Sequence, residues 1–317
     1  MLLLSFLAAI GLGAALLMLP VSTVSRDIGF IDALFTATSA VCVTGLTVVD
    51  TGTYFSVFGQ CVILFLIQIG GLGIMTISVA LFQIIGKKVV FQQRMAMQEV
   101  FSHTPRADIY SLIWTVFKFT IMIELAGALV LFLYWGRHSS LPDAAFNAMF
   151  HSISAFCNAG FSLFETSLMQ ENGSFIVNVA VVLLIILGGI GFPVVYEVYE
   201  RFRKAKKGRF SLQSKVVMTT SALLILAGAL VILAAERELI AQMGFWRSLM
   251  SAVFQSVTCR TAGFNTLDIA SLNTAVLFYD VSHAGGRVSW SCGGASKPPL
   301  WPYWLPFPGA ACGGINV

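Results

Sequence analysis

The stretch FTATSAVCVTGLTVVD, from Phe35 to Asp50, determines how the rest of the chain is interpreted. It begins as an apolar, helix-like segment, reaches a glycine at Gly45 and then becomes polar. The apolar part is too short to cross a bilayer, because a spanning helix needs about 20 apolar residues. Long apolar stretches lie on either side of it, at residues 1–19 and 56–86. The pattern predicts a span, a re-entrant half-helix with a glycine at its tip, and a return span.

The same unit returns twice, as FHSISAFCNAGFSLFE (150–165) and FQSVTCRTAGFNTLD (254–268). Each copy has a phenylalanine upstream of the glycine, a large apolar residue directly after it, a small polar residue next, and an acid five places after it. In chain order these are Phe35, Phe150 and Phe254; Gly45, Gly160 and Gly263; Leu46, Phe161 and Phe264; Thr47, Ser162 and Asn265; Asp50, Glu165 and Asp268. The third copy is one residue shorter between the phenylalanine and the glycine. Internal repetition of this kind predicts repeated structural units in one chain.

The composition indicates an all-α integral membrane protein. The 317 residues are 57% hydrophobic and 11% charged, whereas soluble domains carry about 25% charged residues. The apolar runs are long enough for helices and lack the alternation of a membrane barrel. The six cysteines form no CxxC pair, and no metal-ligand spacing, nucleotide-binding loop or nucleophile motif is present. The sequence therefore predicts neither an enzyme nor a cofactor, and no nucleic-acid partner.

The repeats divide the chain into units of outgoing span (M1), pore helix and return span (M2). A signal peptide is the alternative for residues 1–19, although no basic residue precedes that stretch. The return spans are expected at residues 57–85 and 177–199. About two and a half units are present, and the predicted divisions are 1–86 (first unit), 87–108 (linker), 109–200 (second unit), 201–215 (basic linker), 216–278 (third M1 and pore helix) and 279–317 (tail).

The distribution of charge predicts the orientation. The linkers 87–108 and 201–215 hold most of the basic residues, so the positive-inside rule places them in the cytoplasm. The re-entrant helices then enter the membrane from outside. The acids that follow the three glycines are expected to form an acidic outer vestibule that raises the local cation concentration, namely Asp50, Glu165 and Asp268.

Converging re-entrant segments would place backbone carbonyls around one axis at membrane depth. Such carbonyls can replace the hydration shell of a monovalent cation, and a glycine permits the turn that the backbone needs. One glycine per segment predicts few tightly formed ion sites. The candidate cation ligands are the carbonyl groups of the filter segments, defined as Val43, Thr44 and Gly45; Asn158, Ala159 and Gly160; and Thr261, Ala262 and Gly263. The alternative is that the glycines only allow close helix packing.

Four stretches carry a resemblance to a known family: DALFTATSAVCVTGL (32–46), QIGGLGIMT (68–76), FHSISAFCNAGFSLF (150–164) and TCRTAGFNTLD (258–268). They resemble the Trk/Ktr/HKT superfamily of potassium transporters, particularly the bacterial Ktr-type membrane subunit. The resemblance implies four units in a pseudo-fourfold pore, with Gly45, Gly160 and Gly263 as filter glycines. It also implies potassium uptake across the plasma membrane, often sodium-assisted, by a homodimer on a cytoplasmic nucleotide-binding ring.

The sequence departs from that family after Phe278. The segment 279–317 holds five of the nine prolines and three of the six tryptophans, and it contains no stretch that could span a membrane. The change of composition indicates a shifted reading frame, with a genuine Pro/Gly-rich tail as the alternative. The third M2 and the fourth unit are not recognisable, and three quarters of a ring cannot enclose a cation. An inactive truncated remnant, or a non-conducting assembly subunit, is therefore the alternative to a potassium transporter.

Several further residues have structural interpretations. Glu124 lies inside an apolar span, where an acid is either a hydrogen-bonding residue or part of the ion pathway. Arg260 lies beside a filter segment and is expected to be structural, because a cation is a poor ligand for a cation. The glycine runs 70–73 and 188–191 are expected to let helices pack closely rather than to form a gate.

Overall fold

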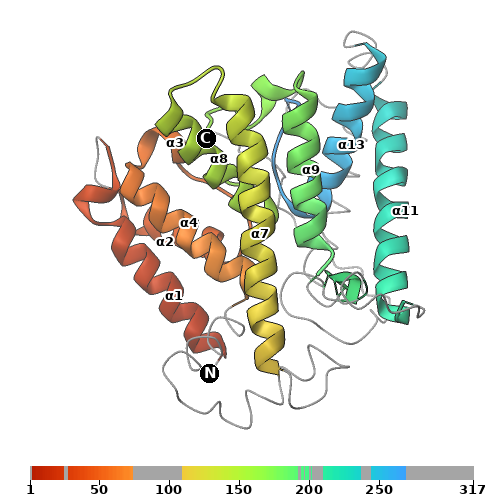
Figure 1. Cartoon of the computed structure of the whole chain (residues 1–317). Helices are drawn as coiled ribbons and strands as arrows, with labels where there is room; N and C mark the ends of the chain where they lie inside the picture. The colour runs from red at the N-terminus through yellow and green to blue at the C-terminus, as the bar shows by residue number, and fades with distance from the viewer. Residues whose placement is uncertain are drawn as a thin grey trace.

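The computed structural model describes residues 2–24, 28–73, 109–191, 194–195, 197–199, 201, 210–236 and 244–268. The predicted linker 87–108 and the tail 279–317 lie outside these residues. Within them the elements are helices, with one isolated β-bridge between Thr23 and Phe55. The predicted all-α fold is confirmed for this part of the chain (Figure 1).

The helices follow the predicted units. The first unit contains α1 (Leu2–Leu17), η1 (Pro20–Ser22), α2 (Phe30–Val41), α3 (Thr51–Tyr54) and α4 (Val57–Leu72). The second contains α7 (Ile109–Trp135), α8 (Leu141–Phe156), η2 (Met169–Glu171) and α9 (Phe175–Gly189). The third contains α11 (Leu212–Ala235) and α13 (Phe245–Thr261). The helix α11 begins inside the segment 201–215, which the sequence analysis assigned to a linker.

Serine side chains begin four of these helices. The hydroxyl oxygens of Ser56, Ser140, Ser174 and Ser211 each accept a hydrogen bond from the backbone N–H three residues later. This bond satisfies one of the amide groups that a helix leaves unpaired at its start. At α8, Pro142 stands in the first turn, where it removes no helical hydrogen bond.

Glycines end the two return helices earlier than predicted. Gly73 has a φ of 80° directly after α4, and Gly191 has a φ of 91° shortly after α9. This left-handed backbone conformation terminates a helix. Helix α4 therefore ends at Leu72 and α9 at Gly189, and residues 74–85 of the first predicted return span lie outside the described residues.

Two of the described helices are long and apolar enough to cross a membrane, at Trp114–Trp135 in α7 and at Leu212–Ala235 in α11. Shorter apolar helices occur at Leu4–Leu17, Phe30–Val41, Val57–Leu72 and Phe175–Gly189. The helix α2 has only 12 residues, which fits its predicted re-entrant role.

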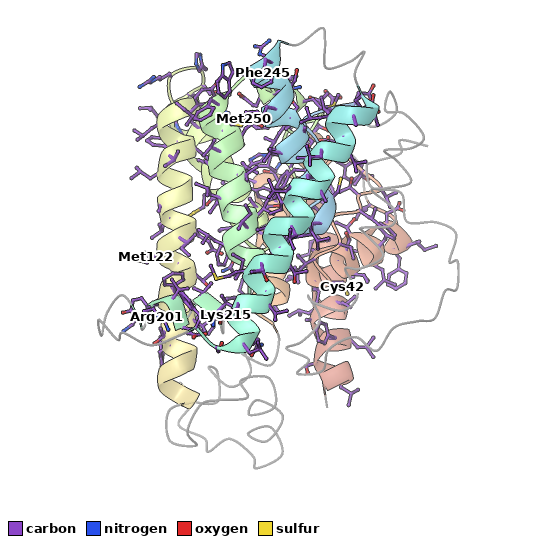
Figure 2. All side chains as sticks on the ribbon, turned by 90° about the vertical axis from the view of Figure 1, so that its right-hand side faces the viewer. Cys42, Met122, Arg201, Lys215, Phe245 and Met250 are labelled. Atoms are coloured by element: carbon purple, nitrogen blue, oxygen red, sulfur yellow. The ribbon has the colours of Figure 1, made fainter. Side chains whose placement is uncertain are left out.

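Each pore helix packs against neighbouring spans, and α8 and α13 also contact the preceding unit. Helix α2 packs against α1 and α4, α8 packs against α7 and α9, and α13 packs against α11 and α9. In addition, α4 contacts α8, which joins the first unit to the second. Figure 2 shows Arg201 and Lys215 toward one end of the helices and Phe245 toward the other. The basic residues and the start of the third pore helix therefore lie at opposite ends.

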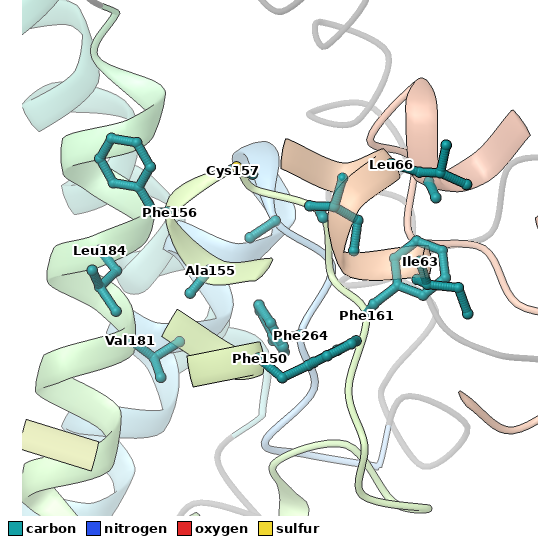
Figure 3. Close-up of a cluster of buried hydrophobic side chains, with 14 of the residues drawn as sticks. Ile63, Leu66, Phe150, Ala155, Phe156, Cys157, Phe161, Val181, Leu184 and Phe264 are labelled. Carbon is teal, nitrogen blue, oxygen red and sulfur yellow. The ribbon is translucent and has the colours of Figure 1, made fainter. Parts of the chain in front are cut away.

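The core lies where the three pore helices meet the return helices. Its largest fully buried side chains include Phe150, Phe161, Phe254 and Phe264, all from the second and third repeats. Figure 3 shows Phe161 pointing toward Ile63 of α4, and both belong to one buried cluster. In the second repeat, the residue after the filter glycine thus packs against the return helix of the preceding unit.

Candidate functional site

The three filter segments leave the ends of the three pore helices. The C-cap residue of α2 is Cys42 and that of α8 is Cys157, so the first two segments start directly after their helices. The third differs, because Thr261 is the last residue of α13 and Ala262 is its C-cap. Only part of the third segment is non-helical, in keeping with the one-residue shortening of that repeat.

The three filter glycines adopt a backbone conformation that favours glycine. Their φ angles are 76° at Gly45, 74° at Gly160 and 83° at Gly263. Residues with a Cβ rarely adopt such angles, whereas glycine does so without penalty. The predicted glycine positions therefore coincide with the tightest turns of the three segments.

Neighbouring segments approach each other so closely that a side chain would not fit. A Cβ added to Gly45 would lie 2.4 Å from the carbonyl oxygen of Ala159. A Cβ added to Gly160 would lie 2.3 Å from the carbonyl oxygen of Ala262. The structure thus brings the three segments side by side, and Gly45 and Gly160 are each needed for contact with the next segment.

An equivalent backbone hydrogen bond connects each filter segment to its own pore helix. The backbone N–H groups of Thr44, Ala159 and Gly263 donate to the carbonyl oxygens of Ser39, Ser154 and Thr258, at 2.9, 2.8 and 3.2 Å. Within the described residues, the carbonyl oxygens of Thr44, Ala159 and Gly263 accept no hydrogen bond. Ala159 is buried, and a buried carbonyl normally has a partner, so its oxygen is available to a ligand.

Hydroxyl groups fix the residue after the glycine in two repeats. Ser154 Oγ donates to the carbonyl oxygen of Phe161 and Thr258 Oγ1 donates to that of Phe264, both at 2.8 Å. These two carbonyl oxygens are therefore occupied. The candidate ligands remain in the segments before them.

Replacing Thr258 with valine is expected to destabilise the third segment, because the carbonyl of Phe264 would then be buried without its partner. Such a loss costs about 1–3 kcal/mol. Thermal unfolding of the purified protein in detergent measures it. Thr219→Val is the matched control, because the exposed Thr219 hydroxyl bonds only to its own helix. Equal melting temperatures for the two variants would contradict the anchoring role.

Val43 holds a strained conformation at the start of the first segment. Its φ is 56°, which is unfavourable for a β-branched residue, and the equivalent Asn158 has a φ of 58°. Asparagine tolerates this region far better than valine does. The strain at Val43 belongs to the segment whose carbonyls are candidate ligands.

Replacing Val43 with asparagine is expected to stabilise the fold by about 1 kcal/mol, because relief of strain outweighs the loss of a half-buried methyl pair. Thermal unfolding shows directly whether the melting temperature rises or falls. Val48→Asn is the control, since Val48 is exposed and its φ is not positive. A V43N protein that melts below wild type would contradict the strain argument.

The three predicted vestibule acids have different surroundings. The Asp50 carboxylate accepts hydrogen bonds from the backbone N–H and the hydroxyl of Thr53, at 2.7 and 2.9 Å, and so caps α3. Glu165 and Asp268 are exposed. Asp50 thus has a structural task, and the common vestibule stays a prediction.

The sequence analysis missed one residue of the second repeat, His151. Its Nδ1–H donates to the carbonyl oxygen of Asn147 at 2.8 Å, and its Nε2 accepts from the Ser162 hydroxyl at 2.9 Å. The ring is fully buried and stacks on Phe164 with centroids 4.6 Å apart. His151 therefore fixes the chain just after Gly160. Its place next to the repeated Phe150 was the only signal in the sequence.

The first repeat is uncovered on one flank. Phe35 and Leu46 are 40% and 38% exposed, whereas their counterparts Phe150 and Phe161 are fully buried. Phe161 is covered by the return helix of the preceding unit, and no such helix covers Leu46 among the described residues. The described contacts join the first segment to the second and the second to the third.

Known proteins are similar to this chain in sequence. The sequence model of the family described as "TrkH: Cation transport protein" matches residues 5–284. The Ktr system potassium uptake protein B of Bacillus subtilis is 43% identical over 277 residues, covering 86% of this chain and 61% of that protein. The potassium/sodium uptake protein NtpJ of Enterococcus hirae is 35% identical and covers 93% and 66%. The chain thus spans about two thirds or less of these relatives' length.

A solved structure shows the same fold. The potassium transporter TrkH of Vibrio parahaemolyticus superposes with a TM-score of 0.62 at 20% identity, covering 88% of this chain and 54% of that one. At this identity the match bears on fold alone, and it agrees with the helical membrane fold predicted from the repeats. The family match over most of its length shows that the chain belongs to the TrkH family of cation transport proteins.

Proposed function

We propose that the chain forms the potassium-conducting part of an uptake system in the plasma membrane. One observation carries the proposal: in consecutive repeats, a filter glycine with positive φ lies against the carbonyl of the next segment. We infer that this repeated contact arranges the carbonyl groups of neighbouring segments side by side. Carbonyl oxygens so arranged can replace the water around a monovalent cation.

The relatives support potassium as the cation. Those at 35–43% identity are named as potassium or potassium/sodium uptake proteins, and the filter repeats lie inside the matched region. Because each segment carries a single glycine, we expect one main cation site formed by the carbonyls of the predicted filter residues. The acids Asp50, Glu165 and Asp268 would concentrate cations above it.

The orientation and partners belong to the same proposal. The end that carries Arg201 and Lys215 would face the cytoplasm, as the positive-inside rule requires. A homodimer on a cytoplasmic nucleotide-binding ring is the assembly that the family resemblance implies. The uncovered flank at Phe35 and Leu46 is where the fourth side of the pore would pack.

Uptake of potassium by cells that lack their own uptake systems tests the proposal. Provided that residues outside the described ones or a partner chain supply the fourth side of the pore, expression of the chain is expected to restore growth at low potassium, and the variant Gly160→Ala at equal membrane abundance is expected not to. Growth that is equal with both proteins would overturn the carbonyl filter. Growth with neither would overturn conduction by this chain.

A non-conducting assembly subunit is the second candidate, and the exposed flank favours it. Phe35 and Leu46 present a large apolar surface at a position that is buried in the other repeats. A subunit of this kind would co-purify with a full-length relative. Replacing Phe35 and Leu46 with serine is expected to abolish that co-purification, whereas serine at the exposed Leu223 of α11 is expected to leave it intact.

A further inference from the structure

Behind the second filter segment lies a polar cluster formed by Glu124 of α7, Gln68 of α4 and Cys157 at the end of α8. The Gln68 amide donates to both carboxylate oxygens of Glu124, at 3.1 and 3.2 Å. The Cys157 thiol lies 3.7 Å from Gln68 Oε1 and 4.0 Å from Glu124 Oε1. The cluster therefore joins the return helix of the first unit to the outgoing helix and filter of the second.

The cluster is closely enclosed. Glu124 is 5% exposed and Cys157 is 8% exposed. A Cβ added to Gly71 of α4 would lie 2.5 Å from the Cys157 sulfur, so that glycine lets the first unit approach the thiol. An acid buried inside a span is expensive unless its hydrogen bonds are satisfied. Here Gln68 satisfies the carboxylate, and no basic residue of the described chain pairs with it.

Cys157 is directly followed by Asn158, the first residue of the second filter segment. The equivalent positions, three residues before each filter glycine, hold Cys42 and Arg260 in the other repeats. Arg260 instead donates to Ser221 of its own outgoing helix, at 2.6 Å. Among the described repeats, only the second therefore links its filter segment to the preceding return helix through a buried acid.

We propose that Glu124 is a positioning residue for the filter. Its carboxylate, through Gln68 and Cys157, holds the second filter segment against the first unit and so sets the spacing between the carbonyls of Ala159 and the first segment. Selectivity among monovalent cations depends on the number and placement of such carbonyls. The expected effect on selectivity rests on the proposed potassium site. The positioning of the second filter segment does not depend on that site.

Alkylation of the full-length chain in detergent tests the positioning. Purified wild type and Glu124→Ala are treated with N-ethylmaleimide, and each cysteine peptide is quantified by mass spectrometry. Exposed Cys61 serves as the reference, and Cys259, buried in the third unit, reports general unfolding. Because Glu124→Ala releases Cys157, we expect its alkylation to rise about tenfold relative to Cys61, with Cys259 unchanged.

A conservative variant separates positioning from a role in the ion pathway. Glu124→Gln keeps an oxygen for the Gln68 amide, so positioning predicts alkylation and cation preference close to wild type. Gln68→Leu removes the other partner of the link and is expected to behave as Glu124→Ala does. If Glu124→Ala does not fold, Gln68→Leu is used in its place. Ser152→Ala is the matched control, because Ser152 donates to the Glu124 backbone carbonyl and not to its carboxylate.

The second readout is the difference between potassium and sodium in raising the melting temperature of the same proteins. We expect Glu124→Ala and Gln68→Leu to lose this difference and Glu124→Gln and Ser152→Ala to keep it. Unchanged Cys157 alkylation in both disruptive variants, or a parallel rise at Cys259, would overturn the positioning role. Loss of the difference in Glu124→Gln would overturn it in favour of a charge in the pathway. A wild type without any cation effect would overturn the proposed function, while the alkylation still decides the positioning.

Discussion

Replacing Gly160 with alanine is expected to weaken potassium binding at least about 100-fold. The unfavourable backbone conformation and the steric clash of the added Cβ together cost about 3 kcal/mol. The alanine would have to adopt a φ of 74°. Its Cβ would also lie 2.3 Å from the carbonyl oxygen of Ala262, which would have to move out of the filter. Potassium-dependent thermal stabilisation of the purified chain measures the loss.

The matched control for this variant is Gly11→Ala. Gly11 lies in α1 with no atom within 4 Å of an added Cβ, so that replacement is expected to leave potassium binding unchanged. Alanine also favours the helix over glycine by about 1 kcal/mol. Equal potassium affinity of the Gly160 and Gly11 variants would show that the second segment does not contribute to the site.

Replacing Gly188 with alanine is expected to have the largest effect on folding. Its added Cβ would lie 1.7 Å from the carbonyl oxygen of Phe156, at the end of the second pore helix. The equivalent Gly70 lies against Val41 in the same way, with 2.1 Å between the added Cβ and the carbonyl oxygen. Overpacking typically costs about 1–3 kcal/mol, and here the obstacle is backbone that cannot rotate away.

Thermal unfolding and the yield of monodisperse protein measure the Gly188 effect. The Gly188 variant is expected to melt well below wild type or to aggregate, whereas Gly11→Ala is expected to melt at or slightly above it. Because the added Cβ would also lie 3.1 Å from the side-chain nitrogen of Asn158, the folded fraction is expected to bind potassium more weakly than wild type as well. Normal stability of the Gly188 variant would contradict the close packing of α9 on α8.

The sequence predicted the repeated units and the three glycine tips because these depend on local requirements. A positive φ needs glycine wherever the turn occurs, so Gly45, Gly160 and Gly263 mark their positions directly. The long apolar run 109–135 coincides with α7. The interpretation of the glycine runs as packing sites also agrees with the structure, at Gly70 and Gly188.

The remaining features depend on contacts between distant parts of the chain. Gln68 and Glu124 meet across 56 positions, and nothing in either local sequence indicates the other. The use of Asp50 as a helix cap was missed because the repeat alignment suggested a common role for all three acids. The helical state of Thr261 follows from a one-residue shortening, whose effect only the packing of α13 determines.

The most direct measurement is anomalous X-ray scattering from crystals of this chain grown with rubidium in place of potassium. Rubidium has the same charge as potassium, is slightly larger and scatters anomalously. Our central prediction is a rubidium peak in direct contact with backbone carbonyls of the segments that contain Gly45, Gly160 and Gly263. Ordered filter segments without a peak between them, in crystals that bind rubidium elsewhere, would contradict it.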